Sequence, residues 1–493
     1  MQLKRLYIQD YKIFKGFTYD FPKSPEILNN VIIGVNGSGK STILEVLAQI
    51  FSDVILKEKS KFGFLLEYLM PNNLDIAIYA ASSNDRIVLE VSKEGKTVSS
   101  FDVINKEQDI YEFGVKKLSL YDLIPSNIVV YYSGLSEILK NIIQPHNILT
   151  SKRYREGNTI SNNGLFYFQP KHFNIILLSL LSFEYGDIPK FLEKKAKISG
   201  FKSLTIRLQK PDWASDTIEK FWGARGEVRK FLDYLEENET TPEELSNPEL
   251  SKRPGSIVIE TWKDEFIIIT IVNQKRLFEI RDFLIEERKL FDIMNIMLYD
   301  GLLKNISFTL IKQNNELKNF NVLSEGEQQI ITIKGLSELL VNQNSLFLFD
   351  EPDTYLHPRW QRQFIQEIEE TISSNINNKI TFLIATHSPQ LLSNANPERT
   401  SVRIIEEGQL IESTPKYYGR EISSILYNLM GVEERNKTIK KDLSNLFTLI
   451  EDEEIEGAEL ELTRLTEILG ETDPDIKDAE LQIQYLKEDE ADN

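Results

Sequence analysis

The fold of this chain is decided by one stretch, Val31-Ile32-Ile33-Gly34-Val35-Asn36-Gly37-Ser38-Gly39-Lys40-Ser41-Thr42. Three β-branched apolar residues predict a buried strand, and the apolar residues of 43–47 follow at helical spacing. The spacing G-x-x-x-x-G-K-S is that of a P-loop, whose backbone N–H groups point at a phosphate while the next helix adds the positive end of its dipole. We therefore predict a nucleoside triphosphate site.

The side chains of this loop have distinct expected tasks. Lys40 would reach the terminal phosphates, and the Ser41 hydroxyl would ligate Mg²⁺. The rest of the predicted phosphate-binding set is Asn36, Gly37, Ser38, Gly39 and Thr42. Lys12, just ahead of the P-loop strand, either approaches the phosphates or is a solvated edge lysine.

Composition limits the cell compartment and the partners. The 493 residues include 41% hydrophobic ones, enough for a large core and several domains. The chain has no cysteine, so it forms no disulfide or thiolate metal site, which fits a reducing cytoplasm, and it carries no apolar run of membrane-spanning length. We expect a cytoplasmic protein without membrane contact.

Charge argues against nonspecific nucleic-acid binding. The formal net charge is −19, so phosphate contacts would need a local basic patch. Two clusters, 152–155 and 194–202, are candidates for contacting DNA, and ordinary solvated surface is the alternative. The basic residues of the clusters are Lys152, Arg153, Arg155, Lys194, Lys195, Lys197 and Lys202.

Four regions follow from the pattern along the chain. Residues 1–135 hold the P-loop and alternating segments that predict an antiparallel β subdomain. Residues 136–305 are expected to be a mainly helical insertion, with one alternating stretch at 201–208. Residues 306–420 hold the remaining motifs, and 421–493 are helical and acidic, with Leu460, Leu462, Leu465 and Leu469 on an apolar face.

Two apolar strands of the third region end in chemically active residues. Ser345–Phe349 is followed by Asp350 and Glu351, and 379–385 is followed shortly by His387. Beside a P-loop, Asp350 would hold the Mg²⁺ shell and Glu351 would polarise the water that attacks the γ-phosphate. His387 would reach the γ-phosphate or the attacking water.

A second anion-binding device lies at 323–328, Leu-Ser-Glu-Gly-Glu-Gln, which leads into a helix. It places the Ser324 hydroxyl, Gly326 and Glu327 at a helix N-terminus. Because one nucleotide site does not need two such devices, we expect this one to cap the γ-phosphate held by another subunit.

In order and spacing these motifs resemble the ABC-type ATPases of the SMC/RecF/OLD class. The resemblance implies an α/β fold, an ABC-type P-loop ATPase core with a mixed sheet, that hydrolyses ATP with Mg²⁺. It also implies a head-to-tail dimer, or a higher oligomer, around ATP. Glu325 replaces the usual first glycine of the signature, and His357 follows Leu356 where transporters have Asp, as in OLD-type and defence-associated ATPases.

The segments 418–426, 430–432 and 469–474 resemble PtuA-type ATPase subunits of Septu anti-phage systems, which also occur as retron effectors. This resemblance implies a role as sensor and regulator of a partner HNH nuclease, PtuB-like, and a possible complex with a retron reverse transcriptase and its nucleic acid. The acidic C-terminal helices are the candidate docking surface. The four histidines are scattered, so we expect no nuclease site in this chain.

Three alternatives stay open. A RecF-like repair clamp would grip duplex DNA itself. A defence ATPase of another kind would work with a Toprim effector, as in PARIS systems. A transporter or ABC-F ATPase is disfavoured by the single ATPase cassette and the large insertion.

Overall fold

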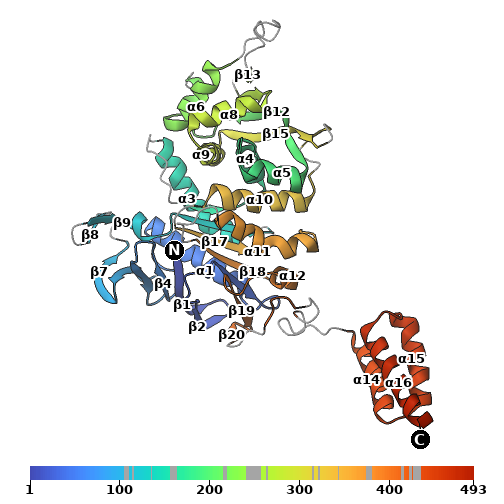
Figure 1. Ribbon diagram of the computed structural model, residues 1–493. Helices are drawn as coiled ribbons and strands as arrows, with labels where there is room; N and C mark the ends of the chain where they lie inside the picture. Colours follow the sequence, from blue (N-terminus) through green and yellow to red (C-terminus); the bar gives the residue numbers. More distant parts are fainter. Residues whose placement is uncertain are drawn as a thin grey trace. The chain divides into compact units, whose positions relative to one another are not determined.

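A computed structural model shows how the chain folds. It describes residues 1–104, 110–113, 116–134, 136–155, 164–214, 219–239, 257–262, 265–313, 316–319, 323–341, 344–373, 380–411, 416–420, 425 and 435–492. Contacts divide the chain into two units, Met1–Arg420 and Glu421–Asn493, which Figure 1 shows with their elements labelled. Within the described ranges, no helix has the length and apolarity needed to cross a membrane.

The first unit is built on a seven-stranded sheet. Its order is β11 (Gly164–Tyr167), β10 (Asn127–Tyr132), β17 (Ser345–Asp350), β18 (Thr381–Thr386), β3 (Asn29–Ile33), β19 (Thr400–Glu406) and β20 (Gln409–Ile411). All neighbours are parallel except the β19–β20 hairpin. The central strands are fully buried, as expected for continuous apolar runs in a parallel sheet. The predicted strands of the P-loop and of 345–349 are confirmed.

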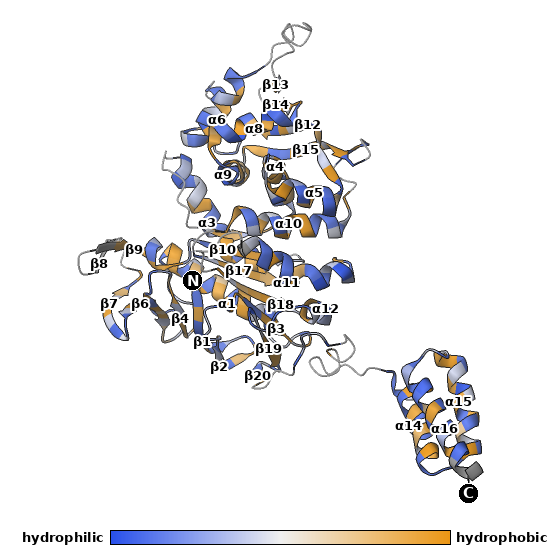
Figure 2. Cartoon of the chain, viewed as in Figure 1, coloured by the Kyte–Doolittle hydropathy of each residue, from blue (hydrophilic) through white to orange (hydrophobic). Residues whose placement is uncertain are grey.

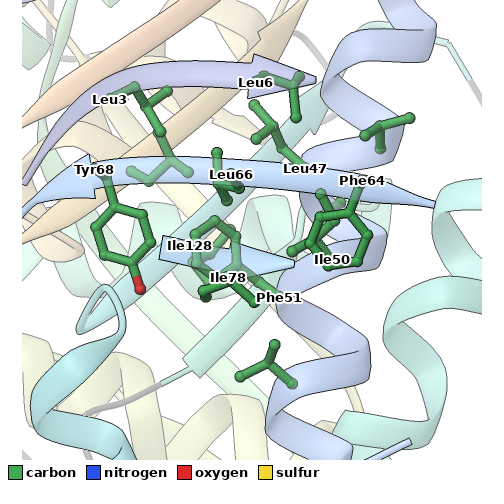
Figure 3. Packing of buried hydrophobic residues seen from close by; sticks show 14 of the residues in the cluster. Leu3, Leu6, Leu47, Ile50, Phe51, Phe64, Leu66, Tyr68, Ile78 and Ile128 are labelled. Carbon is green, nitrogen blue, oxygen red and sulfur yellow. The ribbon is translucent and has the colours of Figure 1, made fainter. Parts of the chain in front are cut away.

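A six-stranded antiparallel sheet lies across helix α1 (Lys40–Leu56) from the central sheet. Its order is β2 (Phe14–Asp20), β1 (Gln2–Tyr11), β4 (Phe64–Leu69), β5 (Asp75–Ala80), β6 (Val88–Lys93) and β7 (Lys96–Asp102). Figure 3 shows Leu47, Ile50 and Phe51 of α1 packed among Leu3, Leu66 and other apolar side chains of this sheet. The same cluster includes Ile128 and Leu346 of the central sheet, so α1 is buried between the two sheets. Sequence reasoning missed β4.

Short elements and further helices surround these two sheets. They are β8 (Ile110–Phe113), β9 (Lys116–Ser119), α2 (Leu120–Leu123), α10 (Glu325–Leu339), α11 (Pro358–Ser373) and α12 (Pro389–Ser393). Helix α10 packs against α11 and against α4 of the next region. At the second of these contacts, Gly335 allows the close approach, because a Cβ there would lie 2.2 Å from Ile176 Cγ2.

Residues 136–305 contain more strand than predicted. The helices are α3 (Glu137–Arg155), α4 (Phe173–Leu181), α5 (Asp187–Ala196), α6 (Gly226–Glu237), α8 (Gln274–Leu284) and α9 (Glu287–Tyr299), with 3₁₀ turns at Pro170–His172 and Lys220–Gly223. A five-stranded antiparallel sheet accompanies them, in the order β13 (Ile257–Trp262), β14 (Phe266–Ile271), β12 (Ile198–Gln209), β15 (Leu303–Lys312) and β16 (Leu317–Asn319). The mainly helical expectation overlooked β13 and β14, because a run such as Phe266–Ile271 has no periodicity that separates strand from buried helix.

The second unit, taken by itself, contains a three-helix bundle of α14 (Lys437–Glu451), α15 (Ile455–Leu469) and α16 (Pro474–Asp492). Its core includes Leu446, Leu465 and Ile476, and Figure 2 shows polar residues outside. Gly470 ends α15 with φ +86°. The predicted apolar face is wrong at Leu460, which is 77% exposed, whereas Leu465 is buried and Leu462 and Leu469 are partly buried against it.

Candidate functional site

The candidate site lies where four parallel strands end. Strands β10, β17, β18 and β3 are neighbours in the sheet, so their carboxyl ends share one edge. Glycine-rich residues follow β3, Asp350 and Glu351 stand at the end of β17, and His387 follows β18. Ser133 and Gly134 follow β10 at the same edge. Residues distant in the sequence are therefore brought together by sheet order.

The loop after β3 is shaped by close packing at its glycines. Gly39 has φ +111°, and a Cβ there would lie 2.6 Å from the Phe14 ring. A Cβ at Gly34 would lie 2.2 Å from the carbonyl oxygen of Ile405. Helix α1 begins at Lys40, so its first N–H groups face the loop. The loop thus fits only glycine at these two positions.

The buried lysine of the loop is held by backbone carbonyls. Lys40 Nζ donates to the oxygens of Gly34 at 2.8 Å and Val35 at 3.1 Å. Burial lowers the pKa of Lys40, while the nearby Glu351 and Asp350 carboxylates oppose this shift. The ammonium therefore lies between the loop and the acidic end of β17.

A cavity of about 480 Å³ opens at this edge. It unites the predicted residues Asn36, Gly37, Gly39, Lys40, Ser41, Thr42, Glu351 and His387 with Tyr132, Ser133, Gly134, Thr354 and Tyr355. Ser38 is buried behind it, and its carbonyl accepts a hydrogen bond from the Gly408 N–H of the hairpin turn at 3.1 Å. The geometry suits a nucleotide whose phosphates meet the loop and whose γ-phosphate faces the carboxylate and the imidazole.

The side chain of Asp350 gives the strongest support for a metal site. It lines an adjoining cavity of about 360 Å³ together with Ser41 and Thr42. The side chain is 3% exposed, and its Oδ1 has no hydrogen-bond partner within the described part of the chain. Burial raises the pKa of Asp350 to about 6, and Glu351 adds to this, whereas Ser41 and Lys40 oppose it. A buried, unpartnered carboxylate oxygen beside a hydroxyl fits the oxygen ligands that Mg²⁺ prefers.

Water would complete such a coordination shell. Among the described residues, no group of three or more acidic or histidine side chains is placed to hold a metal. Mg²⁺ usually keeps several waters and is bound through one or two protein oxygens plus substrate phosphates. The pair of Ser41 and Asp350 matches that pattern.

Glu351 and His387 form a contact pair. His387 Nδ1 lies 2.6 Å from Glu351 Oε2, and the imidazole is 58% exposed. Glu351 has φ +51°, and its N–H donates to the Ala385 carbonyl at 2.8 Å. A carboxylate beside an imidazole in this cavity can accept a proton from a water next to the γ-phosphate.

The position of Lys12 combines features of both interpretations, because the side chain is ion-paired and also lies near the site. Its Nζ lies 2.6 Å from Glu45 Oε2, and it lines the same cavity as Asp350. The residue has φ +52° in the β1–β2 turn. It is an ion-paired lysine close to the site.

The segment at 323–328 lies outside the cavity that the P-loop residues line. Ser324 caps α10, and its Oγ accepts from the Glu327 N–H at 3.3 Å while Glu327 Oε2 accepts from the Ser324 N–H at 2.8 Å. Glu327 also lies 3.7 Å from Lys312. Among the described residues that line the P-loop cavity, Ser324, Gly326 and Glu327 are not found. The structure leaves Ser324 exposed and away from the nucleotide cavity of its own chain.

Three cavity residues were missed by sequence reasoning. Tyr132 is the last residue of β10, and the Ser-Gly that follows was the available signal. Thr354 and Tyr355 lie in the turn after Glu351, and only their closeness to the acidic pair could have suggested them. Their exposed side chains carry no motif of their own.

The two basic clusters are partly neutralised. Arg155 pairs with Asp300 at 3.0 Å, and Lys195 pairs with Glu367 at 2.7 Å. Arg153 donates to the Tyr121 hydroxyl at 3.0 Å. These contacts involve three of the seven basic residues, so both interpretations of the clusters stay open.

This sheet, loop and acidic edge define an α/β P-loop ATPase core. Residues 30–393 match the family described as "AAA domain, putative AbiEii toxin, Type IV TA system". The chain belongs to this family of AAA-domain ATPases.

Two curated relatives match most of the chain. The Retron Vc95 probable ATPase of Vibrio cholerae serotype O1 biovar El Tor is 24% identical over 464 residues, which cover 86% of this chain and 78% of that protein. The Retron Ec83 probable ATPase of Escherichia coli is 24% identical over 471 residues, covering 88% and 77%. This chain is therefore similar along most of its length to ATPases named for retrons.

Two solved structures were also compared. An SMC head bound to the C-terminal winged-helix domain of ScpA is 11% identical, with 83% of this chain and 98% of that chain covered, at a TM-score of 0.35. An ATP-binding cassette of an ABC transporter is 14% identical, with 87% and 95% covered, at 0.29. Neither score reaches 0.5, so the fold assignment rests on the strand order and the family match.

Proposed function

We propose that the chain binds and hydrolyses ATP and works as the sensor and regulatory subunit of an anti-phage defence complex. The observation that carries the ATPase part is the single cavity that joins the P-loop with Glu351 and His387. The defence part draws support from the similarity to retron-named ATPases.

In the proposed reaction, the P-loop N–H groups and Lys40 hold the phosphates of ATP. Mg²⁺, when bound through Ser41 and Asp350, neutralises charge on the β- and γ-phosphates. Glu351 accepts a proton from the attacking water, and His387 orients that carboxylate through the 2.6 Å contact. Loss of carbonyl contacts at Lys40 accompanies ATP entry, because the same ammonium then serves the phosphates.

The site is proposed to be completed by a second copy. Ser324 and Gly326 stand at the exposed N-terminus of α10, outside the P-loop cavity of their own chain. A helix N-terminus favours an anion, and here the Glu327 carboxylate accepts from the Ser324 N–H, so a γ-phosphate would take the place of that carboxylate. In a head-to-tail dimer, this end would cap the γ-phosphate bound by the partner subunit, and higher oligomers would be built from such dimers.

Glu351→Gln tests this proposal. The amide keeps the shape but cannot accept the proton, so we expect ATP turnover to fall by about two orders of magnitude or more while ATP binding persists. The trapped ATP should convert monomers into dimers in size-exclusion chromatography with light scattering. Ser324→Arg in the same background is the matched variant, which should bind ATP without dimerising. Unchanged hydrolysis in Glu351→Gln would refute the catalytic assignment.

A partner nuclease is proposed to dock on the second unit. The bundle is rich in carboxylates, and its large exposed apolar side chains are Leu460, Ile468, Leu481 and Tyr485, all on α15 and α16. A basic nuclease, with an HNH enzyme as the first candidate, suits this surface by charge. A retron reverse transcriptase with its nucleic acid is a further proposed component, and the complex is expected in the cytoplasm.

Truncation after residue 434 tests docking. The shortened chain should keep ATP turnover and lose co-purification with an HNH nuclease encoded beside it. Co-purification at the full level would refute docking on the second unit. Tight, salt-sensitive, ATP-dependent binding of duplex DNA by the chain alone would instead support the RecF-like clamp.

A further inference from the structure

The turn that follows Glu351, residues 352–356, contacts several residues at the edge of the nucleotide cavity. Thr354 and Tyr355 line that cavity. Thr354 Oγ1 donates to the Glu351 carbonyl at 3.0 Å and lies 3.2 Å from Ser133 Oγ. Buried Asp353 accepts from the Thr386 hydroxyl at 2.9 Å, one residue before His387. Any displacement of this turn therefore reaches the proposed base and its imidazole.

One side chain of α10 grips both ends of this turn. Gln329 is 4% exposed. Its Nε2 donates to the Pro352 carbonyl at 2.6 Å, and its Oε1 accepts from the Tyr355 N–H at 3.1 Å. The two contacts fix the orientation of the amide, since exchanging O and N would set donor against donor and acceptor against acceptor.

The same helix end touches the turn a second time. A Cβ at Gly326 would lie 2.9 Å from the Tyr355 carbonyl oxygen. Gln329 follows the Ser324 cap by five positions, which is less than one and a half helical turns. The N-terminus of α10 and the turn after Glu351 are thus packed as one piece.

We propose that Gln329 is a positioning residue that couples the two ATP sites of the dimer. When Ser324 and Gly326 cap the nucleotide of the partner subunit, α10 is held in place. Through its two hydrogen bonds, the Gln329 amide then fixes the turn, and the turn fixes Glu351 in the site of the same chain. Hydrolysis at one site then depends on ATP at the other. This inference rests on the proposed dimer.

A matched control lies on another helix. Gln361 of α11 donates from Nε2 to the Asp353 carbonyl at 2.9 Å, so it holds the same turn. It lies on α11, which packs against α10, but among the described residues its side chain hydrogen-bonds to Asp353 and Ser388 and to no residue of α10. If a substitution only loosens the turn, replacing either glutamine should change ATP hydrolysis in the same way. If the coupling runs through α10, only the replacement of Gln329 should remove it.

The test compares steady-state ATP hydrolysis over a range of ATP concentrations. With two coupled sites we expect a wild-type Hill coefficient approaching about 2. Gln329→Met keeps the volume and loses both hydrogen bonds, so its Hill coefficient should fall to about 1 and its kcat by roughly tenfold. Gln361→Met should lose kcat and keep the wild-type Hill coefficient. Gln329→Met combined with Glu351→Gln should still dimerise with ATP.

Each outcome decides the matter. A wild-type Hill coefficient in Gln329→Met, an equal loss in Gln361→Met, or a wild type with a coefficient of 1 would overturn the coupling while leaving the ATPase dimer standing. A wild type without ATP turnover or ATP-dependent dimers would refute the proposed function itself. If Gln329→Met aggregates, Gln329→Glu takes its place, because it keeps the acceptor for Tyr355 and loses the donor to Pro352.

Discussion

Asp350→Asn should stabilise the ATP-free protein and weaken its response to Mg²⁺ and ATP. Burial raises the pKa of Asp350 from 3.8 to about 6, so the folded state carries an unfavourable carboxylate at neutral pH. The difference of about two pKa units corresponds to roughly 3 kcal/mol at pH 7.5. This is an upper value, since Lys40 loses a neighbouring carboxylate in the variant.

The sign of the pH dependence follows from the two protonation states. The folded protein takes up the proton as pH falls through about 6, and the unfolded chain does so near 3.8. Between these values the folded state binds more protons, so the penalty shrinks on acidification. The advantage of Asp350→Asn should be complete at pH 7.5, about half as large at pH 5, and about a fifth as large at pH 4.

Thermal unfolding of the first unit measures this effect. Its 420 residues imply an unfolding entropy of about 0.9 kcal/mol/K, so roughly 3 kcal/mol shifts Tm by about 3 °C. Wild type and variant are compared by differential scanning calorimetry without nucleotide at pH 7.5 and 5, then with Mg²⁺ and ATP. The reasoning is refuted if Asp350→Asn melts below the wild type at pH 7.5, or if its advantage grows on acidification.

Three further predictions concern other parts of the molecule. Asp53→Asn in α1 should raise Tm at pH 8 and lose this advantage as pH falls toward 4, because burial raises the pKa of Asp53 to about 7; calorimetry across this range checks it, and an advantage that does not shrink contradicts it. Gly34→Ala should abolish ATP binding and destabilise the first unit by about 1–3 kcal/mol, since its Cβ meets the Ile405 carbonyl; an ATP titration at the wild-type affinity would speak against this. Leu465→Ala should cost the second unit about 2–5 kcal/mol, which limited proteolysis would show as faster cleavage after residue 434 with ATP turnover unchanged.

The sequence predicted the nucleotide cavity better than the region between its halves. The P-loop, the Asp-Glu pair and the histidine are local patterns that each follow an apolar strand. A parallel sheet brings the carboxyl ends of its strands to one edge, so these motifs could be expected to meet there. Tyr132 and Tyr355 were missed because they reach the cavity through strand order and a turn, not through a motif. The β13–β14 hairpin was missed because apolar runs without alternation fit a strand and a buried helix equally well.

The segment at 323–328 shows a second limit of prediction from the sequence. Ser324 and Glu327 were recognised as a helix N-terminus, and the capping box confirms that local structure. Their expected nucleotide contact depends on a second copy of the chain. A single sequence carries the helix cap but not the quaternary geometry, so the role stays a proposal.

The order of the central sheet has a consequence for synthesis on the ribosome. Strand β3, which precedes the P-loop, pairs with β18 and β19, whose residues 381–406 are synthesised about 350 residues after it. The nascent polypeptide therefore displays the phosphate-binding sequence long before that sequence has a sheet to hold it. Cotranslational chaperones would meet an exposed Val31–Ile33 segment throughout this interval. ATP binding by stalled chains should therefore begin abruptly once residue 411 has left the exit tunnel.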